Sequence, residues 1–183
     1  MKYLVLAAGV CFATSLPAEV LKLTPADPQP ESLSPGLAVS YAYPKDVKTL
    51  EQAAKAAKSA EPGAPLAGLD HPDNTDGDMT LTSTKAYKVV AQINGYVQFE
   101  EPGTYTIEFV SNDGVQAHIG GQEVVFFDGR HPCEPGEPVQ AEVPVAGWYD
   151  IDVLYFQRKG SACLSMLAGI GEPDWMPNEA FGH

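Results

Sequence analysis

From Lys85 to Met166 apolar and polar residues alternate over short runs that turn-forming residues separate. Tyr105, Ile107 and Phe109, for example, alternate with polar neighbours, which predicts a strand that buries one face. Further runs of this kind are 89–93, 96–99, 115–119, 124–127, 139–143, 149–155 and 162–166. About seven or eight short strands at this spacing are typical of an all-β protein, a sandwich or barrel.

Turn signals divide these runs and suggest how they connect. Asn94-Gly95 is the strongest hairpin signal in the chain, so the sequence predicts a tight turn there. Asn112-Asp113-Gly114 and Gly120-Gly121 are further turn sequences. Residues 36–43 also alternate and predict a first strand, which precedes all of these turns.

One segment near the N-terminus has a helical period instead. Val47, Leu50, Ala54 and Ala57 recur at helical spacing, and Asp46 precedes them as a candidate N-cap. The pattern predicts a short surface helix that ends near Ser59, inserted into an otherwise all-β chain.

The first 18 residues have the features of a secretory signal peptide. Lys2 precedes an apolar run over residues 3–13, and small residues follow up to Ala18. The run is too short to span a bilayer, and a buried N-terminal helix is the alternative. We therefore expect a signal peptide over 1–18 and a secreted or periplasmic protein without a transmembrane segment after cleavage.

The remaining chain divides by composition. Residues 19–35 are polar and rich in proline and predict an extended leader, and residues 36–168 hold the predicted strands. Residues 169–183 form a tail with two aromatic residues between prolines, which we expect to lie against the surface.

Two cysteines remain once Cys11 is removed with the signal. In an oxidising compartment Cys133 and Cys163 are expected to form a disulfide. Closing a loop of about 30 residues would stabilise the fold by roughly 3–4 kcal/mol. The alternatives are a metal site, which would need more ligands of this type, and a redox pair, which usually has closer spacing.

Charge and motif content exclude several functions. Without Lys2 the chain carries 10 basic and 24 acidic residues, and such a polyanion repels nucleic acid and anionic lipid. No Gly-x-Ser-x-Gly, His-Glu-x-x-His or phosphate-loop motif is present. We therefore expect a protein that is not an enzyme.

An acidic loop at residues 69–78 is a candidate calcium site. Its aspartates resemble an EF-hand loop, but counting back from Gly77 places Pro72 at the first ligand position. Turn-forming aspartate and asparagine residues explain the composition, and calcium binding in this loop is the alternative.

Several motifs in one order resemble a known family. Those motifs are Gly95-Tyr96-Val97-Gln98-Phe99, Ser111-Asn112-Asp113-Gly114, Gly120-Gly121, Ala146-Gly147-Trp148-Tyr149 and Tyr155-Phe156. The arrangement resembles the protective-antigen fourteen-kilodalton domain, the PA14 domain, over residues 36–168. The resemblance implies an antiparallel β-sandwich of the PA14 type, a fold found in toxins, glycosidases, yeast flocculins and bacterial adhesins.

The resemblance also implies a ligand site. Several PA14 adhesins bind sugars through one calcium ion. Two adjacent aspartates joined by a cis peptide hold this ion together with a later loop. In this chain the pair falls on Asn112 and Asp113 and the later loop on residues 157–161. The implied metal ligands are Asn112, Asp113 and Gln157, and the implied ligand-binding residues also include Arg158, Lys159 and Ser161.

This chain departs from the family pattern at the site. The first position of the pair is an amide, and Arg158 and Lys159 place two cations beside the expected ion, which weakens calcium binding. A plain tight turn at Asn112-Asp113 is therefore the alternative.

We expect an exported, non-catalytic recognition module that binds a glycan or cell-surface carbohydrate, with calcium as its cofactor. The alternative is a structural or assembly module that binds another envelope protein, which the altered calcium motif and the proline-rich ends favour. An accessory domain of a hydrolase is a third candidate.

Overall fold

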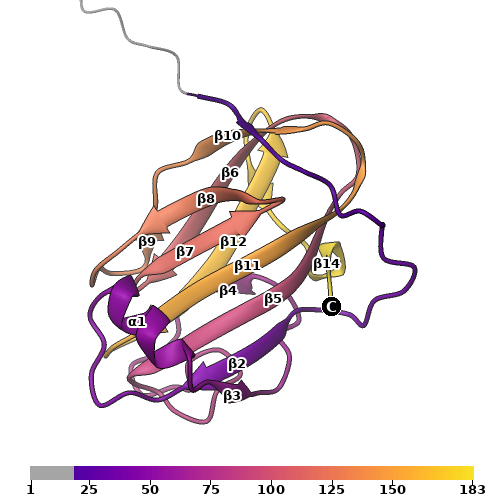
Figure 1. Ribbon diagram of the computed structural model, residues 1–183. Helices are drawn as coiled ribbons and strands as arrows, with labels where there is room; N and C mark the ends of the chain where they lie inside the picture. Colours follow the sequence, from indigo (N-terminus) through magenta and orange to yellow (C-terminus); the bar gives the residue numbers. More distant parts are fainter. Residues whose placement is uncertain (1–18) are drawn as a thin grey trace, which may run out of the picture.

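The computed structural model describes residues 19–183; the predicted signal peptide and Cys11 lie outside the described residues. Two β-sheets face each other and form a sandwich, which confirms the predicted fold class (Figure 1). The first sheet has the order β1 (Leu21–Lys22), β10 (Val139–Val143), β6 (Gly103–Asn112), β12 (Cys163–Ile170) and β13 (Asp174–Trp175), with β4 (Asp70–His71) paired to β12 and β9 (Glu134–Pro135) paired to β6.

The second sheet contains the two longest strands. Its order is β3 (Glu61–Pro62), β2 (Ala38–Ala42), β5 (Val89–Phe99), β11 (Gly147–Gln157), β7 (Val115–Ile119) and β8 (Gln122–Phe127), with β14 (Phe181–Gly182) paired to β5. The pairs are antiparallel except for β1 with β10. One helix, α1 (Leu50–Ala57), and a 3₁₀ turn, η1 (Asn178–Ala180), complete the fold.

The core lies between the sheets and follows the alternation of the sequence. In β6 the inward side chains of Tyr105, Ile107 and Phe109 are buried, as the pattern predicts. The inward residues of β11, among them Tyr149 and Tyr155, face them in the same cluster. Each large apolar side chain buried in this way stabilises the fold by about 1.5–3 kcal/mol.

The predicted hairpin at Asn94-Gly95 is wrong. Strand β5 runs through both residues, and Gly95 pairs with Ile151 of β11. A Cβ atom at Gly95 would lie 2.5 Å from the carbonyl oxygen of Gly182. The glycine therefore allows β14 to pass close to β5, and it does not form a turn.

The predicted N-cap of the helix is also wrong. Helix α1 begins at Leu50 after Thr49, whose hydroxyl accepts a hydrogen bond of 3.3 Å from the Gln52 N–H. Asp46 lies farther upstream and binds Arg158. Leu50 and Ala53 are buried against the second sheet, so the helix covers one end of that sheet.

The segments that flank the predicted strands also pair with the sheets. Leu23, in the leader, is buried, and β1 pairs with β10 beside it. In the tail β13 pairs with β12 and β14 pairs with β5. Phe181 is buried in the core, whereas Trp175 is 52% exposed. Within residues 19–183 no helical segment has the length and apolarity that crossing a membrane requires.

Candidate functional site

The Asn112–Asp113 turn and the loop that follows β11 meet at one end of the sandwich. Strand β12 begins at Cys163, which pairs with Asn112, so the loop returns beside the turn. The backbone N–H of Arg158 donates to Asp113 Oδ2 at 2.7 Å. The Asp113 N–H in turn donates to the carbonyl oxygen of Phe156 at 3.1 Å. The structure thus brings together the two segments that the sequence analysis paired.

The turn itself is buried and held by hydrogen bonds. Asn112 is 8% exposed and Asp113 is 5% exposed, and the peptide bond between them is cis, as the resemblance implies. The Asn112 side-chain amide donates to Ser161 Oγ at 3.3 Å, and the Tyr155 hydroxyl donates to the Asn112 carbonyl oxygen. The Ser161 contact orients the Asn112 side chain, and the Arg158 N–H orients the Asp113 side chain.

Gln157 closes the second loop and leaves one oxygen free. Its buried side-chain amide donates to the carbonyl oxygens of Gly160 at 3.1 Å and Ser161 at 2.9 Å. Its Oε1 atom is buried without a hydrogen-bond partner among the described residues. A buried acceptor without a donor costs about 1–3 kcal/mol, and a water molecule or a cation would remove that cost.

The two cations of this loop do not act alike. The guanidinium of Arg158 binds Asp46, with 2.8 Å between Nε and Oδ1, and this hydrogen bond lowers the pKa of Asp46 to about 2. Asp46 therefore offsets part of the charge of Arg158, one of the two cations that were expected to weaken calcium binding. Lys159 is exposed in the same loop.

Burial raises the pKa of Asp113 above its ordinary value, and three neighbours act against the shift. They are the backbone of Arg158, the ring and backbone of His131, and the charge of Arg130. The carboxylate thus lies partly desolvated between the two loops, where an ionised group favours a cation or a donor beside it.

His131 is a site residue that the sequence analysis missed. Its ring stacks on Phe127, with 3.7 Å between centroids, and its Nε2 atom is buried without a partner in the part of the chain that the structure describes. The available signal was its position two residues before Cys133, because that cysteine ties its loop to the start of β12.

The predicted disulfide between Cys133 and Cys163 is confirmed. The Cα atoms lie 6.0 Å apart, and the bond closes a separation of 30 residues. An oxygen of Asp73 lies within 4.8 Å of both sulfur atoms, but sulfurs bonded to each other are not free to hold a metal. The disulfide fixes the loop of His131 next to the Asn112–Asp113 turn.

The acidic loop at residues 69–78 borders the same end of the molecule. Asn74 exchanges two hydrogen bonds with Ala162, one of 2.7 Å from the Ala162 N–H to its side chain and one of 3.1 Å between the backbones. Asp76 accepts from the hydroxyl of Tyr87 at 2.6 Å, and Asp78 accepts from the Thr75 N–H at 3.1 Å. Asp76 and Asp78 thus accept hydrogen bonds from donors of the protein, in agreement with the turn interpretation.

The turn and the loop of residues 157–161 carry oxygen atoms of the kind that calcium takes as ligands. Asp113 offers a carboxylate, and Asn112 and Gln157 offer amide oxygens, which is the oxygen-only donor set that calcium prefers. The unpartnered Oε1 of Gln157 is the observation that supports the fit. With one carboxylate the affinity is expected to be that of extracellular modules, a Kd of about 0.1–1 mM.

Comparisons with solved structures return PA14 domains. The PA14 domain of MpAFP antifreeze protein superposes with a TM-score of 0.68 and 16% identity over 86% of this chain and 94% of that one. The PA14 sugar-binding domain from an RTX adhesin superposes with a TM-score of 0.67 and 15% identity over 81% of this chain and 98% of that one. The A domain of epithelial adhesin 9 from Candida glabrata was solved with Galβ1-3GlcNAc. It superposes with a TM-score of 0.64 and 12% identity over 90% of this chain and 95% of that one.

Identities this low show the fold alone, and no curated protein matches the chain in sequence. The family model of the PA14 domain matches residues 34–180, which is most of the chain. The protein therefore belongs to the PA14 domain family.

Proposed function

We propose that this protein is a non-catalytic carbohydrate-binding module whose site lies between the Asn112–Asp113 turn and the loop of residues 157–161. The observation that carries the proposal is the buried carboxylate of Asp113, held by the Arg158 N–H at 2.7 Å beside a loop whose Gln157 has an unpartnered oxygen. Two relatives of the same fold support it, since one is described as sugar-binding and another was solved with Galβ1-3GlcNAc.

Each residue has a role in this proposal. Asp113 supplies the negative charge, and Asn112 and Gln157 supply neutral oxygens. The Arg158 N–H fixes one Asp113 oxygen, and Ser161 orients the Asn112 amide so that its oxygen is free. A bound calcium ion would add coordination positions that vicinal sugar hydroxyls can occupy.

Lys159 and His131 complete the proposed site. Lys159 is exposed in the loop and offers donors to sugar hydroxyls. The His131 ring, stacked on Phe127, adds an aromatic surface at the turn. The proposal assigns recognition to both residues and no chemical step.

The proposal includes export. The predicted signal peptide and the Cys133–Cys163 disulfide support a secreted or periplasmic location, because disulfides persist in oxidising compartments. The partner would then be a glycan on a cell surface or in the envelope.

Thermal unfolding with calcium or with EDTA tests the metal part. At 10 mM calcium a Kd of about 0.1–1 mM would stabilise the protein by about 1.4–2.7 kcal/mol. Asp113→Asn should abolish this gain, whereas Asp70→Asn, an exposed aspartate on β4, should keep it. Equal melting temperatures in calcium and EDTA would remove calcium from the proposal.

A glycan array tests carbohydrate binding itself. We expect glycans with vicinal hydroxyls to bind when calcium is present. The Asp113→Asn variant should not bind them. Binding that persists in EDTA would keep the carbohydrate and remove the metal. An array without hits, for protein shown to be folded, contradicts the proposed function.

A further inference from the structure

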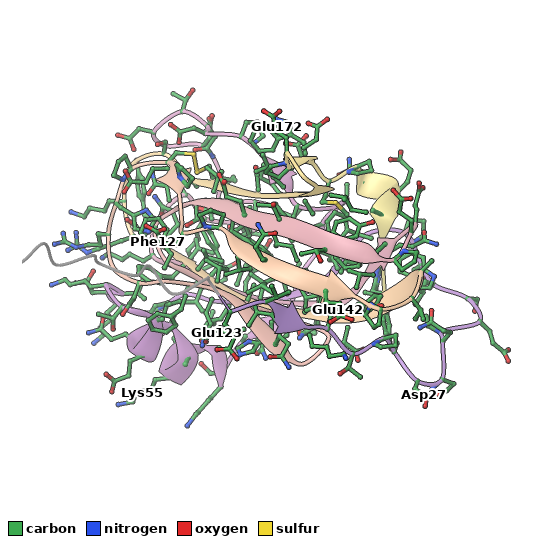
Figure 2. The ribbon with its side chains drawn as sticks, turned by 90° about the horizontal axis from the view of Figure 1, so that it is seen from above. Asp27, Lys55, Glu123, Phe127, Glu142 and Glu172 are labelled. Carbon is green, nitrogen blue, oxygen red and sulfur yellow. A yellow bond between two sulfur atoms is a disulfide. The ribbon has the colours of Figure 1, made fainter. Side chains whose placement is uncertain are left out.

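Two hollows lie at the opposite end of the sandwich from the Asn112–Asp113 turn. Trp148, which lines one of them, is at the start of β11, and Gln157 is at its end, a span of roughly 30 Å in an extended strand. Figure 2 places Phe127, which stacks on His131, and Asp27, which lines the other hollow, at opposite sides of the molecule. The hollows are therefore separate from the proposed carbohydrate site.

The first hollow combines an aromatic ring with carboxylates. It has a volume of about 420 Å³, and Trp148, Leu33 and Phe181 form much of its apolar lining. Glu31 and Glu179 contribute the charged groups. Both glutamates are exposed, and their carboxyl oxygens can accept hydrogen bonds from a ligand.

The second hollow repeats this combination on the other side of residues 30–31. It has a volume of about 490 Å³ and is lined by one ring, that of Tyr96, and by the carboxylates of Asp27, Glu31 and Asp150. Glu31 is thus common to both hollows. Among the described residues that line them there is no lysine, arginine or histidine, so nothing there balances the negative charge.

The segment between the hollows is fixed by hydrogen bonds. Gln29 holds the backbone of Trp148 at both ends, accepting from its N–H at 2.8 Å and donating to its carbonyl oxygen at 3.0 Å. Ser34 and His183 exchange two backbone hydrogen bonds of 2.8 and 2.9 Å. These bonds hold the backbone of the leader on both sides of Glu31, which limits the ordering cost of binding.

An aromatic face beside carboxylates is suited to an organic cation. Ammonium and guanidinium groups are attracted to the face of tryptophan and tyrosine rings, and carboxylates pair with the same groups. Two such hollows that share one carboxylate match two neighbouring cations on one chain. We propose that this end of the molecule binds a basic polypeptide segment, with one lysine or arginine side chain in each hollow and Glu31 between them.

The binding is measured through Trp148. The chain has two tryptophans, so Trp175→Phe leaves Trp148 as the single emitter. Acetylated tetralysine amide should change its emission saturably, with an affinity that falls as salt is added. Tetramethylammonium, which fills one hollow at a time, should bind at least about fivefold more weakly. Tetraglutamine and maltotriose should not bind.

Glu31→Gln tests the shared carboxylate. Glu31 is exposed and makes no hydrogen bond or ion pair with other described residues, so its replacement should not disturb the fold. We expect a loss of about fivefold in tetralysine affinity, the upper range for one exposed ion pair. The matched control is Glu61→Gln, an exposed glutamate on β3, which should bind as the parent does.

Four results would overturn the proposal. These are an absence of tetralysine binding, equal binding of tetramethylammonium, equal losses in Glu31→Gln and Glu61→Gln, and a preference for maltotriose, which would make the hollow of Trp148 a sugar site. Asp113→Asn should leave the tetralysine affinity unchanged, so this proposal and the carbohydrate proposal can fail separately.

Discussion

The charge of Asp113 is buried, and in the absence of a ligand a buried charge lowers the stability of the folded protein. Burial raises its pKa, so the folded chain binds a proton there more readily than the unfolded chain does. Its ionised form at neutral pH therefore reduces the stability of the metal-free protein. A residue kept in that state is consistent with a role in binding rather than in folding.

Asp113→Asn should have opposite consequences in EDTA and in calcium. In EDTA the free energy of unfolding should stay within about 0.5 kcal/mol of wild type or rise, because the amide oxygen still accepts from Arg158 and the buried charge is gone. In calcium the variant should be the less stable protein. Urea unfolding in both buffers measures this, and a large loss in EDTA would mean that Asp113 is structural.

Asp46 gives the converse case, an exposed carboxylate whose charge stabilises the fold. The Arg158 hydrogen bond lowers its pKa to about 2 from an ordinary value of 3.8. Its contribution is therefore complete above pH 4 and is lost as the pH falls from about 4 to 2. The difference in melting temperature between wild type and Asp46→Asn should be largest at pH 6 and much smaller at pH 2, and an undiminished difference at pH 2 contradicts this assignment.

The strands could be predicted from the sequence, whereas the turn signal at Gly95 and the cap signal at Asp46 led to wrong predictions. Alternation reports which face of a strand is buried, so β6 and β11 could be predicted without knowing their partners. The roles of Gly95 and Asp46 depend on residues 87 and 112 positions away, Gly182 and Arg158, which no local pattern contains. Local turn and cap statistics therefore gave the wrong interpretation at both.

The candidate site divides in the same way. The resemblance assigned Asn112, Asp113 and Gln157 to one site from the order of the motifs, and that assignment stays a prediction. It did not indicate His131, whose position depends on the disulfide, or the unpartnered oxygen of Gln157, which depends on how its loop closes. Such features arise only when distant segments are packed together.

Gly95→Ala should weaken the attachment of the C-terminal strand to β5. The added Cβ atom would lie 2.5 Å from the carbonyl oxygen of Gly182, and backbone must move to admit it. We expect a loss of about 1–3 kcal/mol in urea unfolding, the usual cost of overpacking. In a chain truncated after Ala180 the same substitution should cost less, because the Leu37 side chain, 2.7 Å from the added Cβ atom, is then the main remaining close contact. An equal cost would show that β14 is not the cause.

The whole molecule separates its two proposed binding ends by the length of β5 and β11. Each strand has 11 residues, and they pair along their full length, so the second sheet is a rigid spacer between the ends. We therefore expect the two sites to bind independently.

The disulfide allows this independence to be measured, because it lies at one end only, where Cys163 begins β12 opposite Asn112. Cys133→Ser with Cys163→Ser should lower the free energy of unfolding by about 3–4 kcal/mol, through the loop entropy of the unfolded chain. It should also free the loop of His131 beside Asp113, so calcium and glycan affinity should fall. Tetralysine affinity at the hollow of Trp148 should stay the same under conditions where the variant is folded, since Gln29 and β11 still hold that residue. Parallel losses at both ends would instead mean that the sandwich transmits the change, and the two sites would have to be treated as one coupled system.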